Sequence, residues 1–274
     1  MDTRTLDLKG LPFAKGHGTG NDFVIVPDPD GELTLPPDLV AALCDRRRGV
    51  GGDGVLRVVR TAVHPEVADR ADEAEWFMDY RNADGSLAEM CGNGVRVYAR
   101  YLVESGLAHG PRIPILTRAG LVLADIGGET IAVTMPTPVV LGPGRVRVSG
   151  VDFDGTRATC GNPNLVCWVD DPDALDLAGT PVLDPTAFPE SANVEFIAPV
   201  GDKHVRMRVI ERGVGETLSC GSGACAAAAV VLHGQRSGTV TVDVPGGRLT
   251  VTLDGDRCVL SGPAVIVAAG TLSL

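Results

Sequence analysis

Two segments of the chain share one pattern, in which a cysteine followed by Gly-x-Gly opens an apolar helix. The pattern occurs at residues 91–94 and 220–223, and the two cysteines lie 129 positions apart in a chain of 274 residues. The second helix, from Gly221 to about His233, is apolar on all sides, so we expect it to be buried on all sides. A sheet wrapped around a buried helix accommodates both this helix and the strand-rich sequence beside it.

The two halves of the chain present their predicted elements in the same order. In the first half, strands and helices are predicted at 12–27, 37–44, 76–82, 92–105, 112–117, 120–126 and 129–135. In the second half they are predicted at 146–153, 157–160, 165–169, 194–197, 205–211, 221–233, 239–244, 247–253 and 257–260. The shared order indicates an internal duplication, with its boundary at the Met-Pro-Thr-Pro segment, residues 135–138. Two lobes built in this way would leave a cleft between them.

Composition and charge exclude several classes of function. The net charge is −11 and no long run of Lys and Arg is present, so nucleic-acid binding is not expected. The longest apolar run, residues 224–232, is too short to cross a membrane, and residues 1–7 show no signal-peptide pattern. Seven cysteines, an odd number, do not suggest a disulfide framework. We therefore expect a cytoplasmic location, reduced thiols, and neither a membrane nor a nucleic acid as partner.

The positions of Cys91 and Cys220 suggest acid–base chemistry. The unpaired N–H groups of a helix N-terminus stabilise negative charge, so a thiol placed there is biased toward thiolate. The adjacent glycines let the backbone N–H groups approach a carboxylate closely. Two such thiols facing one cleft would take a proton from one side of a carbon and return it on the other; the alternative for each is a buried capping thiol. Cys220 and Cys225 lack the partners or spacing of a metal site or a redox pair, and we expect no metal.

Polar residues in turn-like segments supply candidate ligand contacts. Asparagines stand in such segments at positions 21, 82, 162 and 193, where each is either a turn residue or a neutral contact for a zwitterionic ligand. Glu211 and Arg212 form either a surface ion pair or a clamp for the amino and carboxylate groups of a ligand. The glycine-rich segment 49–54 is interpreted as a tight turn, and the alternative is that it lines the cleft. No lysine lies in a pyridoxal-type pocket motif, so we expect no cofactor.

These motifs together make the chain similar to the diaminopimelate epimerase family of cofactor-independent, two-cysteine enzymes. The similarity runs along nearly the whole length and is strongest in the segments 15–23, 80–86, 90–94, 161–163 and 211–223. The resemblance implies an α+β fold of two pseudo-symmetric lobes, each a mainly antiparallel β-barrel around a central helix, with the active site in the cleft. It also implies that a final strand near 265–268 returns to the first lobe. The expected domains are therefore 1–135 with 264–274, and 136–263.

The resemblance also implies an activity and a set of site residues. The reaction is the interconversion of LL- and meso-2,6-diaminopimelate by proton transfer at the α-carbon, in the biosynthesis of lysine and peptidoglycan precursors. Cys91 and Cys220 are the acid–base pair, with Cys91 as the acid and Cys220 as the base for the LL substrate. The implied substrate-binding residues are Asn21, Asn82, Gly92, Asn93, Asn162, Asn193, Glu211, Arg212, Gly221 and Ser222. The implied partners are a small-molecule amino-acid substrate and a second copy in a homodimer.

The chain departs from the family pattern at two positions. Position 164 is Asn where the family commonly has His, which leaves the supporting proton network open. Position 54 is Gly where some members have a substrate-binding Gln, so that contact is not transferred. Two alternatives remain at this point: a racemase of the same class acting on another amino acid, and a non-catalytic amino-acid-binding protein on the same scaffold.

Overall fold

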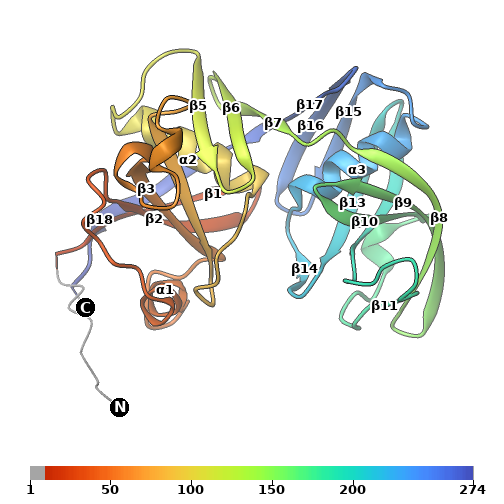
Figure 1. Ribbon diagram of the computed structural model, residues 1–274. Coiled ribbons are helices and arrows are strands. Elements are labelled where there is room, and N and C mark those ends of the chain that lie inside the picture. The colour runs from red at the N-terminus through yellow and green to blue at the C-terminus, as the bar shows by residue number, and fades with distance from the viewer. Residues whose placement is uncertain (1–9, 274) are drawn as a thin grey trace. The chain divides into compact units, whose positions relative to one another are not determined.

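The computed structural model describes residues 10–273 and shows an α+β protein, as predicted (Figure 1). It forms two compact units. The N-terminal unit comprises Met1–Ile131 with Ala264–Leu274, and the C-terminal unit comprises Ala132–Pro263. The sequence predicts the division after residue 135, whereas the structure divides the chain inside β7 (Thr130–Met135). The segment without a signal-peptide pattern, residues 1–7, lies outside the described residues.

The N-terminal unit is a sheet of mixed direction with two α-helices. Its elements are β1 (Pro12–Gly18), β2 (Asn21–Pro27), α1 (Pro37–Cys44), β3 (Gly54–Arg60), β4 (Trp76–Asn82), α2 (Gly92–Glu104), β5 (Arg112–Thr117), β6 (Gly120–Gly127) and β18 (Val265–Thr271). Strand β18 pairs with β1, so the last strand of the chain belongs to this unit. Along the series β18–β1–β2–β3–β4–β5–β6, the β2–β3 and β4–β5 pairs are parallel and the others antiparallel.

The C-terminal unit repeats this plan with one central helix. Its elements after β7 are β8 (Val139–Val148), β9 (Val151–Cys160), β10 (Asn162–Trp168), β11 (Val182–Leu183), β12 (Asn193–Gly201), β13 (His204–Glu211), β14 (Gly215–Thr217), α3 (Gly221–Val231), β15 (Ser237–Val244), β16 (Gly247–Asp254) and β17 (Arg257–Pro263). Along β8–β9–β10–β12–β13–β15–β16, the β10–β12 and β13–β15 pairs are parallel and the others antiparallel. Both units thus pair their strands in one order of directions, which confirms the predicted pseudo-symmetry.

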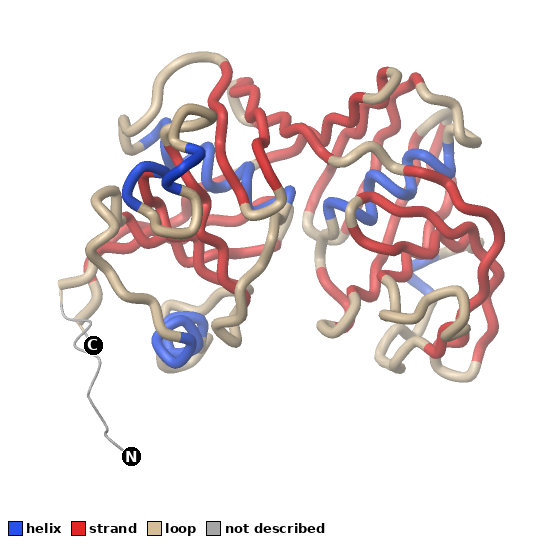
Figure 2. The backbone as a smooth tube through the Cα atoms, in the orientation of Figure 1, coloured by secondary structure: helices blue, strands red, loops and turns tan. Residues whose placement is uncertain are grey.

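Each unit encloses one helix within its strands (Figure 2). Helix α2 contacts every strand from β1 to β6 and also β18, while α3 contacts β8, β9, β10, β12, β15, β16 and β17. The side chains of residues 224–228 in α3 are fully buried, as the apolar sequence predicts. Because four of these five residues are Ala, strands approach the helix closely from all sides. Burial of the helix in turn places its N-terminus at an edge of the unit's core.

Several sequence-based assignments are wrong or incomplete. The predicted strand at 12–27 is a hairpin, because Thr19 and Gly20 turn the chain between β1 and β2, and the short strands β11 and β14 are not predicted. The predicted strand at 146–153 is a hairpin, because Ser149 and Gly150 have positive φ angles of 47° and 81° and turn the chain between β8 and β9. Apolar and polar residues alternate on both sides of this two-residue turn, at 146–148 and again at 151–153, and the alternation changes phase between them. Strand β3 has no counterpart in the prediction: its residues are buried on both faces, including Arg57, so alternation is absent.

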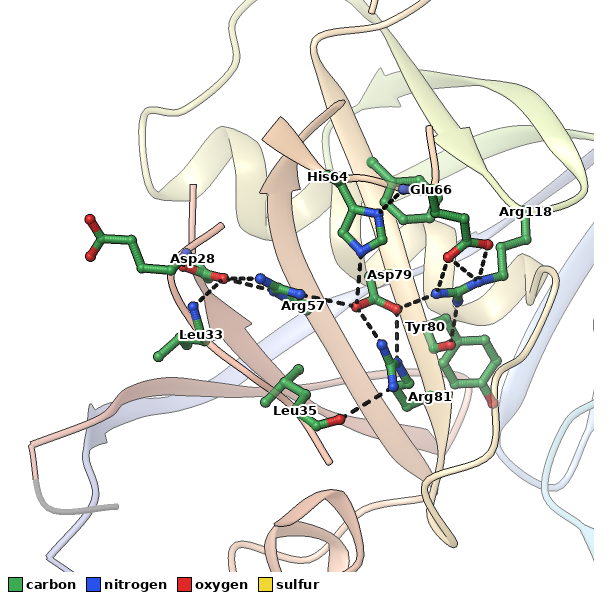
Figure 3. Close-up of polar contacts among 12 residues, drawn as sticks. Asp28, Leu33, Leu35, Arg57, His64, Glu66, Asp79, Tyr80, Arg81 and Arg118 are labelled. Atoms are coloured by element: carbon green, nitrogen blue, oxygen red, sulfur yellow. Dashed lines mark hydrogen bonds and ion pairs between the residues drawn. The ribbon is translucent and has the colours of Figure 1, made fainter. Parts of the chain in front are cut away.

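Arg57 is buried because it belongs to an ion network centred on Asp79 (Figure 3). The Asp79 carboxylate is fully buried and accepts hydrogen bonds from Arg118 Nη2 at 2.6 Å and from Arg81 Nε at 2.9 Å. Arg57 donates from Nε to Asp28 at 2.7 Å and lies 3.6 Å from Asp79. The network joins β3 and β4 to the turn after β5. Burial alone raises the pKa of Asp79, but hydrogen bonds from His64, Arg81 and Arg118 outweigh it and hold the pKa well below its usual range.

Replacing Asp79 by Asn should destabilise the protein. The Asp79→Asn change leaves the buried Arg57 and the partly buried Arg81 and Arg118 short of one negative charge. The free energy of unfolding at pH 7 should therefore fall by about 3 kcal/mol. Because the folded-state pKa is lowered, this stabilisation is complete above the unfolded-state pKa of about 3.9 and is lost as the pH falls below it. Urea unfolding at pH 7 and pH 3 measures both effects. Equal stability of variant and parent at pH 7 would contradict the assignment.

Candidate functional site

Cys91 is the N-cap residue of α2, and its thiol is tied to the first turn of that helix. The residue is in an extended conformation, and its Sγ accepts a hydrogen bond from the backbone N–H of Gly94 at 3.4 Å. The cap therefore fixes the sulfur at the positive end of the helix.

Two asparagines adjoin the Cys91 thiol, and we call these three residues the N-terminal half-site. Asn21 Oδ1 accepts a hydrogen bond from Cys91 Sγ at 3.5 Å and another from Asn93 Nδ2 at 3.3 Å. Asn93 Oδ1 accepts in turn from Arg96 Nη2 at 2.9 Å, and Arg96 is fully buried. The guanidinium thus determines which way the Asn93 amide faces, and Asn93 helps to orient Asn21.

Asp53 holds the other end of the Asn21 amide. Its Oδ2 accepts from Asn21 Nδ2 at 2.8 Å, and its Oδ1 lies 2.7 Å from Arg46. Arg46 also pairs with Asp22, which bonds Lys15 at 2.6 Å. Sequence reasoning interprets residues 49–54 as a tight turn and misses Asp53, because no motif marks a carboxylate that acts on a side chain 32 positions away.

Asn82, a predicted ligand contact, lies at the end of β4. Its Nδ2 donates to Ser86 Oγ at 3.0 Å, within the turn that follows the strand. In the register of the sheet it faces Gly54 on β3. Within residues 10–273, the hydrogen bond described for the Asn82 side chain is this contact inside the turn. The structure therefore does not join Asn82 to the N-terminal half-site.

Cys220 is the N-cap residue of α3 and repeats the geometry of Cys91. Its Sγ accepts from the backbone N–H of Gly223 at 3.4 Å, lies 3.5 Å from Ser222 Oγ, and accepts from Asn193 Nδ2 at 3.8 Å. The thiol is buried. We call Cys220, Ser222 and Asn193 the C-terminal half-site.

Asn164 connects the asparagines of the C-terminal half-site. Its Oδ1 accepts from Asn193 Nδ2 at 3.1 Å, and its own Nδ2 donates to the carbonyl oxygen of Asn162 at 2.7 Å. The side-chain oxygen of Asn193, Oδ1, accepts a hydrogen bond from the backbone N–H of Arg212 at 2.9 Å. Asn164 is fully buried. The residue that departs from the family pattern thus joins the three predicted ligand residues Asn162, Asn193 and Arg212.

In the contacts described, Glu211 and Arg212 do not pair with each other, and each contacts a different residue. Glu211 Oε1 accepts from Thr217 Oγ1 at 2.5 Å on the neighbouring strand β14. Arg212 Nη1 lies 3.6 Å from the carboxylate of Glu190, whose side chain is 84% exposed. An ion pair this exposed contributes little to stability, so Arg212 can exchange Glu190 for another carboxylate at small cost.

The protonation of Cys220 differs from the sequence-based expectation. Burial raises the pKa of the Cys220 thiol well above its usual range, and the negative charges of Glu211 and Glu195 add to this effect. The hydrogen bonds from Ser222 and from the Gly223 N–H act in the opposite direction but are outweighed. At Cys220 the loss of hydration thus exceeds the effect of the helix N-terminus, which by itself favours the thiolate.

In the part of the chain that the structure describes, residues 10–273, no group of three or more His, Cys, Asp and Glu is placed to hold a metal ion. Over the same residues, no helix is both long and apolar enough to cross a membrane. All seven cysteines are free thiols.

Comparison with known sequences identifies the family. The profile of diaminopimelate epimerase matches residues 13–141 and 156–267. The chain belongs to the diaminopimelate epimerase family. A relative named diaminopimelate epimerase from Thermobifida fusca is 53% identical and covers 96% of this chain and 98% of its own. Another of that name from Streptomyces coelicolor is 49% identical, covering 95% of this chain and 94% of its own.

Solved structures show the same fold at low identity. A phenazine biosynthesis protein of the PhzF family from Bacillus anthracis superposes with a TM-score of 0.71 at 19% identity, covering 97% of this chain and all of its own. A hydroxyproline epimerase from Agrobacterium vitis superposes with a TM-score of 0.66 at 16% identity, covering 97% and 93%. These likenesses support the two-unit fold.

The family's glutamine cannot be restored at position 54 without strain. A Cβ on Gly54 would lie 2.5 Å from the carbonyl oxygen of Arg81 and 2.7 Å from Cε2 of Tyr80. Gly54→Gln should therefore lower the free energy of unfolding by about 2 kcal/mol, as overpacking in a core does. Gly54→Ala, the control, should show a similar loss because the Cβ is the cause. Thermal and urea unfolding measure it, and a Gln variant as stable as the parent would contradict this explanation.

Proposed function

We propose that the protein interconverts LL- and meso-2,6-diaminopimelate by a two-base proton transfer, with Cys91 and Cys220 as the acid–base pair. The observation that carries the proposal is that both thiols are N-caps of the enclosed helices, each bonded to the third N–H of its helix and flanked by an asparagine. Named relatives at 53% and 49% identity support the substrate.

The two helix N-termini supply what the thiols lack. An amino-acid α-proton is a very weak acid, and a thiolate of ordinary pKa about 8.5 is a modest base. The reaction therefore needs negative charge on the substrate carboxylate to be stabilised as the proton leaves. We propose that the first turns of α2 and α3 bind this carboxylate through Gly92, Asn93, Gly221 and Ser222. Cys91 gives the proton and Cys220 removes it for the LL substrate, and the roles exchange for the meso substrate.

The remaining polar residues fit the rest of the substrate. We propose that Asn21, Asn82, Asn162, Asn193, Glu211 and Arg212 bind its amino and carboxylate groups. Arg212 presents a planar guanidinium that suits a second carboxylate, and its exposed partner Glu190 is easily displaced. A second amino-acid head group distinguishes diaminopimelate from simpler amino acids.

Location and assembly are proposed on separate grounds. Seven free thiols suit a reducing compartment, and we propose a cytoplasmic location. A homodimer is proposed from the family resemblance. The scheme uses protein groups alone and calls for no cofactor.

Removing either thiol should abolish the reaction. Cys91→Ala and Cys220→Ala should each lower turnover by at least about 10³-fold, because a two-base scheme has no substitute for a missing base. The measurement is stereochemical analysis of diaminopimelate incubated with pure, reduced protein. Near-normal turnover by either variant would exclude the scheme.

Incorporation of deuterium from solvent tests whether the same proteins remove the α-proton of the substrate. The parent enzyme in heavy water should place deuterium at one α-carbon of the product, since the returning proton comes from a thiol that exchanges with solvent. The two alanine variants should stay folded, shown by unchanged thermal unfolding, and form no labelled epimer, because neither can deliver a proton to the opposite face. Epimerised product without label in the parent would rule out proton abstraction.

Asp53 should matter through the Asn21 amide. In Asp53→Ala, Asn21 Nδ2 loses its acceptor, and kcat/KM should fall about tenfold, the effect of one hydrogen bond of about 1.4 kcal/mol. Asp53→Asn keeps an acceptor oxygen at the same place while losing the pairing with Arg46. It should therefore retain most of the activity. Equal losses in both variants would assign the effect to charge and remove the proposed role in orientation.

A further inference from the structure

Glu195 is a buried carboxyl group that the scheme above does not use. It is the third residue of β12, between Val166 on β10 and Val209 on β13. The side chain is fully buried, and neither carboxyl oxygen has a hydrogen-bond partner. It lies against the first turn of α3, because a Cβ on Gly223 would meet Oε1 of Glu195 at 2.5 Å. An unpartnered carboxyl group in a core is costly, so its presence at this place calls for a reason.

The other half of the chain shows that the fold does not require a carboxyl group here. Leu56 is the third residue of β3 and is also fully buried. Its Cδ2 would lie 3.5 Å from a Cβ on Gly94, which is the third residue of α2 as Gly223 is of α3. Leucine therefore fills beside Cys91 the space that glutamate fills beside Cys220. The two cysteines have matching caps and different neighbours.

The groups that face Glu195 are anionic or neutral. Burial raises the pKa of Glu195 well above its usual range, and the charge of Glu211 on β13 raises it further. Burial, together with the charges of Glu195 and Asp154, raises the pKa of the Cys167 thiol on β10 to about 12, so that thiol stays protonated. The same two glutamates act on Cys220. A second negative charge in this region therefore meets strong repulsion.

We propose that Glu195 and Cys220 hold at most one negative charge between them, so that Glu195 must keep its proton while Cys220 acts as the base. The inference rests on the role proposed for Cys220. With one proton on the pair, two forms exist: carboxylate with thiol, and carboxylic acid with thiolate. Only the second contains the base. In the first form the carboxylate opposes loss of the Cys220 proton, so ionisation of the thiol is displaced to higher pH for as long as Glu195 carries the charge. Glu195 is thus a positioning residue that makes Cys220 unequal to Cys91.

The test measures alkylation of Cys220 by iodoacetamide as a function of pH. The proteins are the parent, Glu195→Gln, which keeps the shape and removes the charge, and Glu195→Leu, which copies Leu56. Mass spectrometry of the Cys220 peptide gives the midpoint, and the Cys91 peptide of the same sample is the internal reference. Thermal unfolding checks the fold, and the Leu variant should melt at a higher temperature at pH 8 because it buries no carboxyl group.

We expect the Cys220 midpoint to fall by about one pH unit or more in both variants, while the Cys91 midpoint stays unchanged. A Cys220 midpoint in Glu195→Gln within about 0.2 units of the parent overturns the proposal, whatever the Leu variant shows; if the Gln variant does not fold, Glu195→Leu decides by the same comparison. The measurement requires no turnover. It therefore remains readable if Cys220→Ala proves active and the proposed function fails instead.

Discussion

The structure depends on one compromise, which is the burial of a helix N-terminus whose first N–H groups still need partners. In both units the partner is a cysteine thiol, supplied by the N-cap and bonded to the third N–H of the helix. Sulfur is a weak acceptor, so the N-terminus keeps much of its capacity to bind an anion. The same burial removes water from the thiol and opposes its ionisation, as Cys220 shows. Helix capping, carboxylate binding and thiol protonation therefore all depend on the same cysteine N-cap and on how deeply it is buried.

Much of the fold follows from the sequence. The small, apolar residues of α3 allow a helix that strands surround, and the repeated order of elements indicates two similar units. What the sequence hides is local. The turn at Ser149 and Gly150 lies between two short alternating segments that differ in phase by one residue. Strand β3 lacks alternation because Arg57 is neutralised inside the core. The first prediction fails because of a two-residue turn, and the second because a tertiary ion pair allows a charged residue into a buried strand. The periodicity of apolar residues signals neither.

The candidate site divides in the same way. The cysteines and most asparagines stand in motifs, so their chemistry is visible in the chain. Their orientation is not, because it depends on distant residues with no motif of their own: Arg96 for Asn93, Asp53 for Asn21, and Asn164 for Asn193. Protonation is equally hidden. A helix N-terminus is readable from sequence, whereas the burial that outweighs it at Cys220 appears only when the strands close around the helix.

The return of β18 to β1 has a consequence for biosynthesis. Every strand of the C-terminal unit lies between the two parts of the N-terminal unit in sequence, so β1 has no partner on one edge until residues 265–271 leave the ribosome. The unit whose sequence begins first is thus completed last. Until then β1 presents unpaired backbone groups. These groups can pair with a strand of another nascent chain that is being translated from the same messenger RNA.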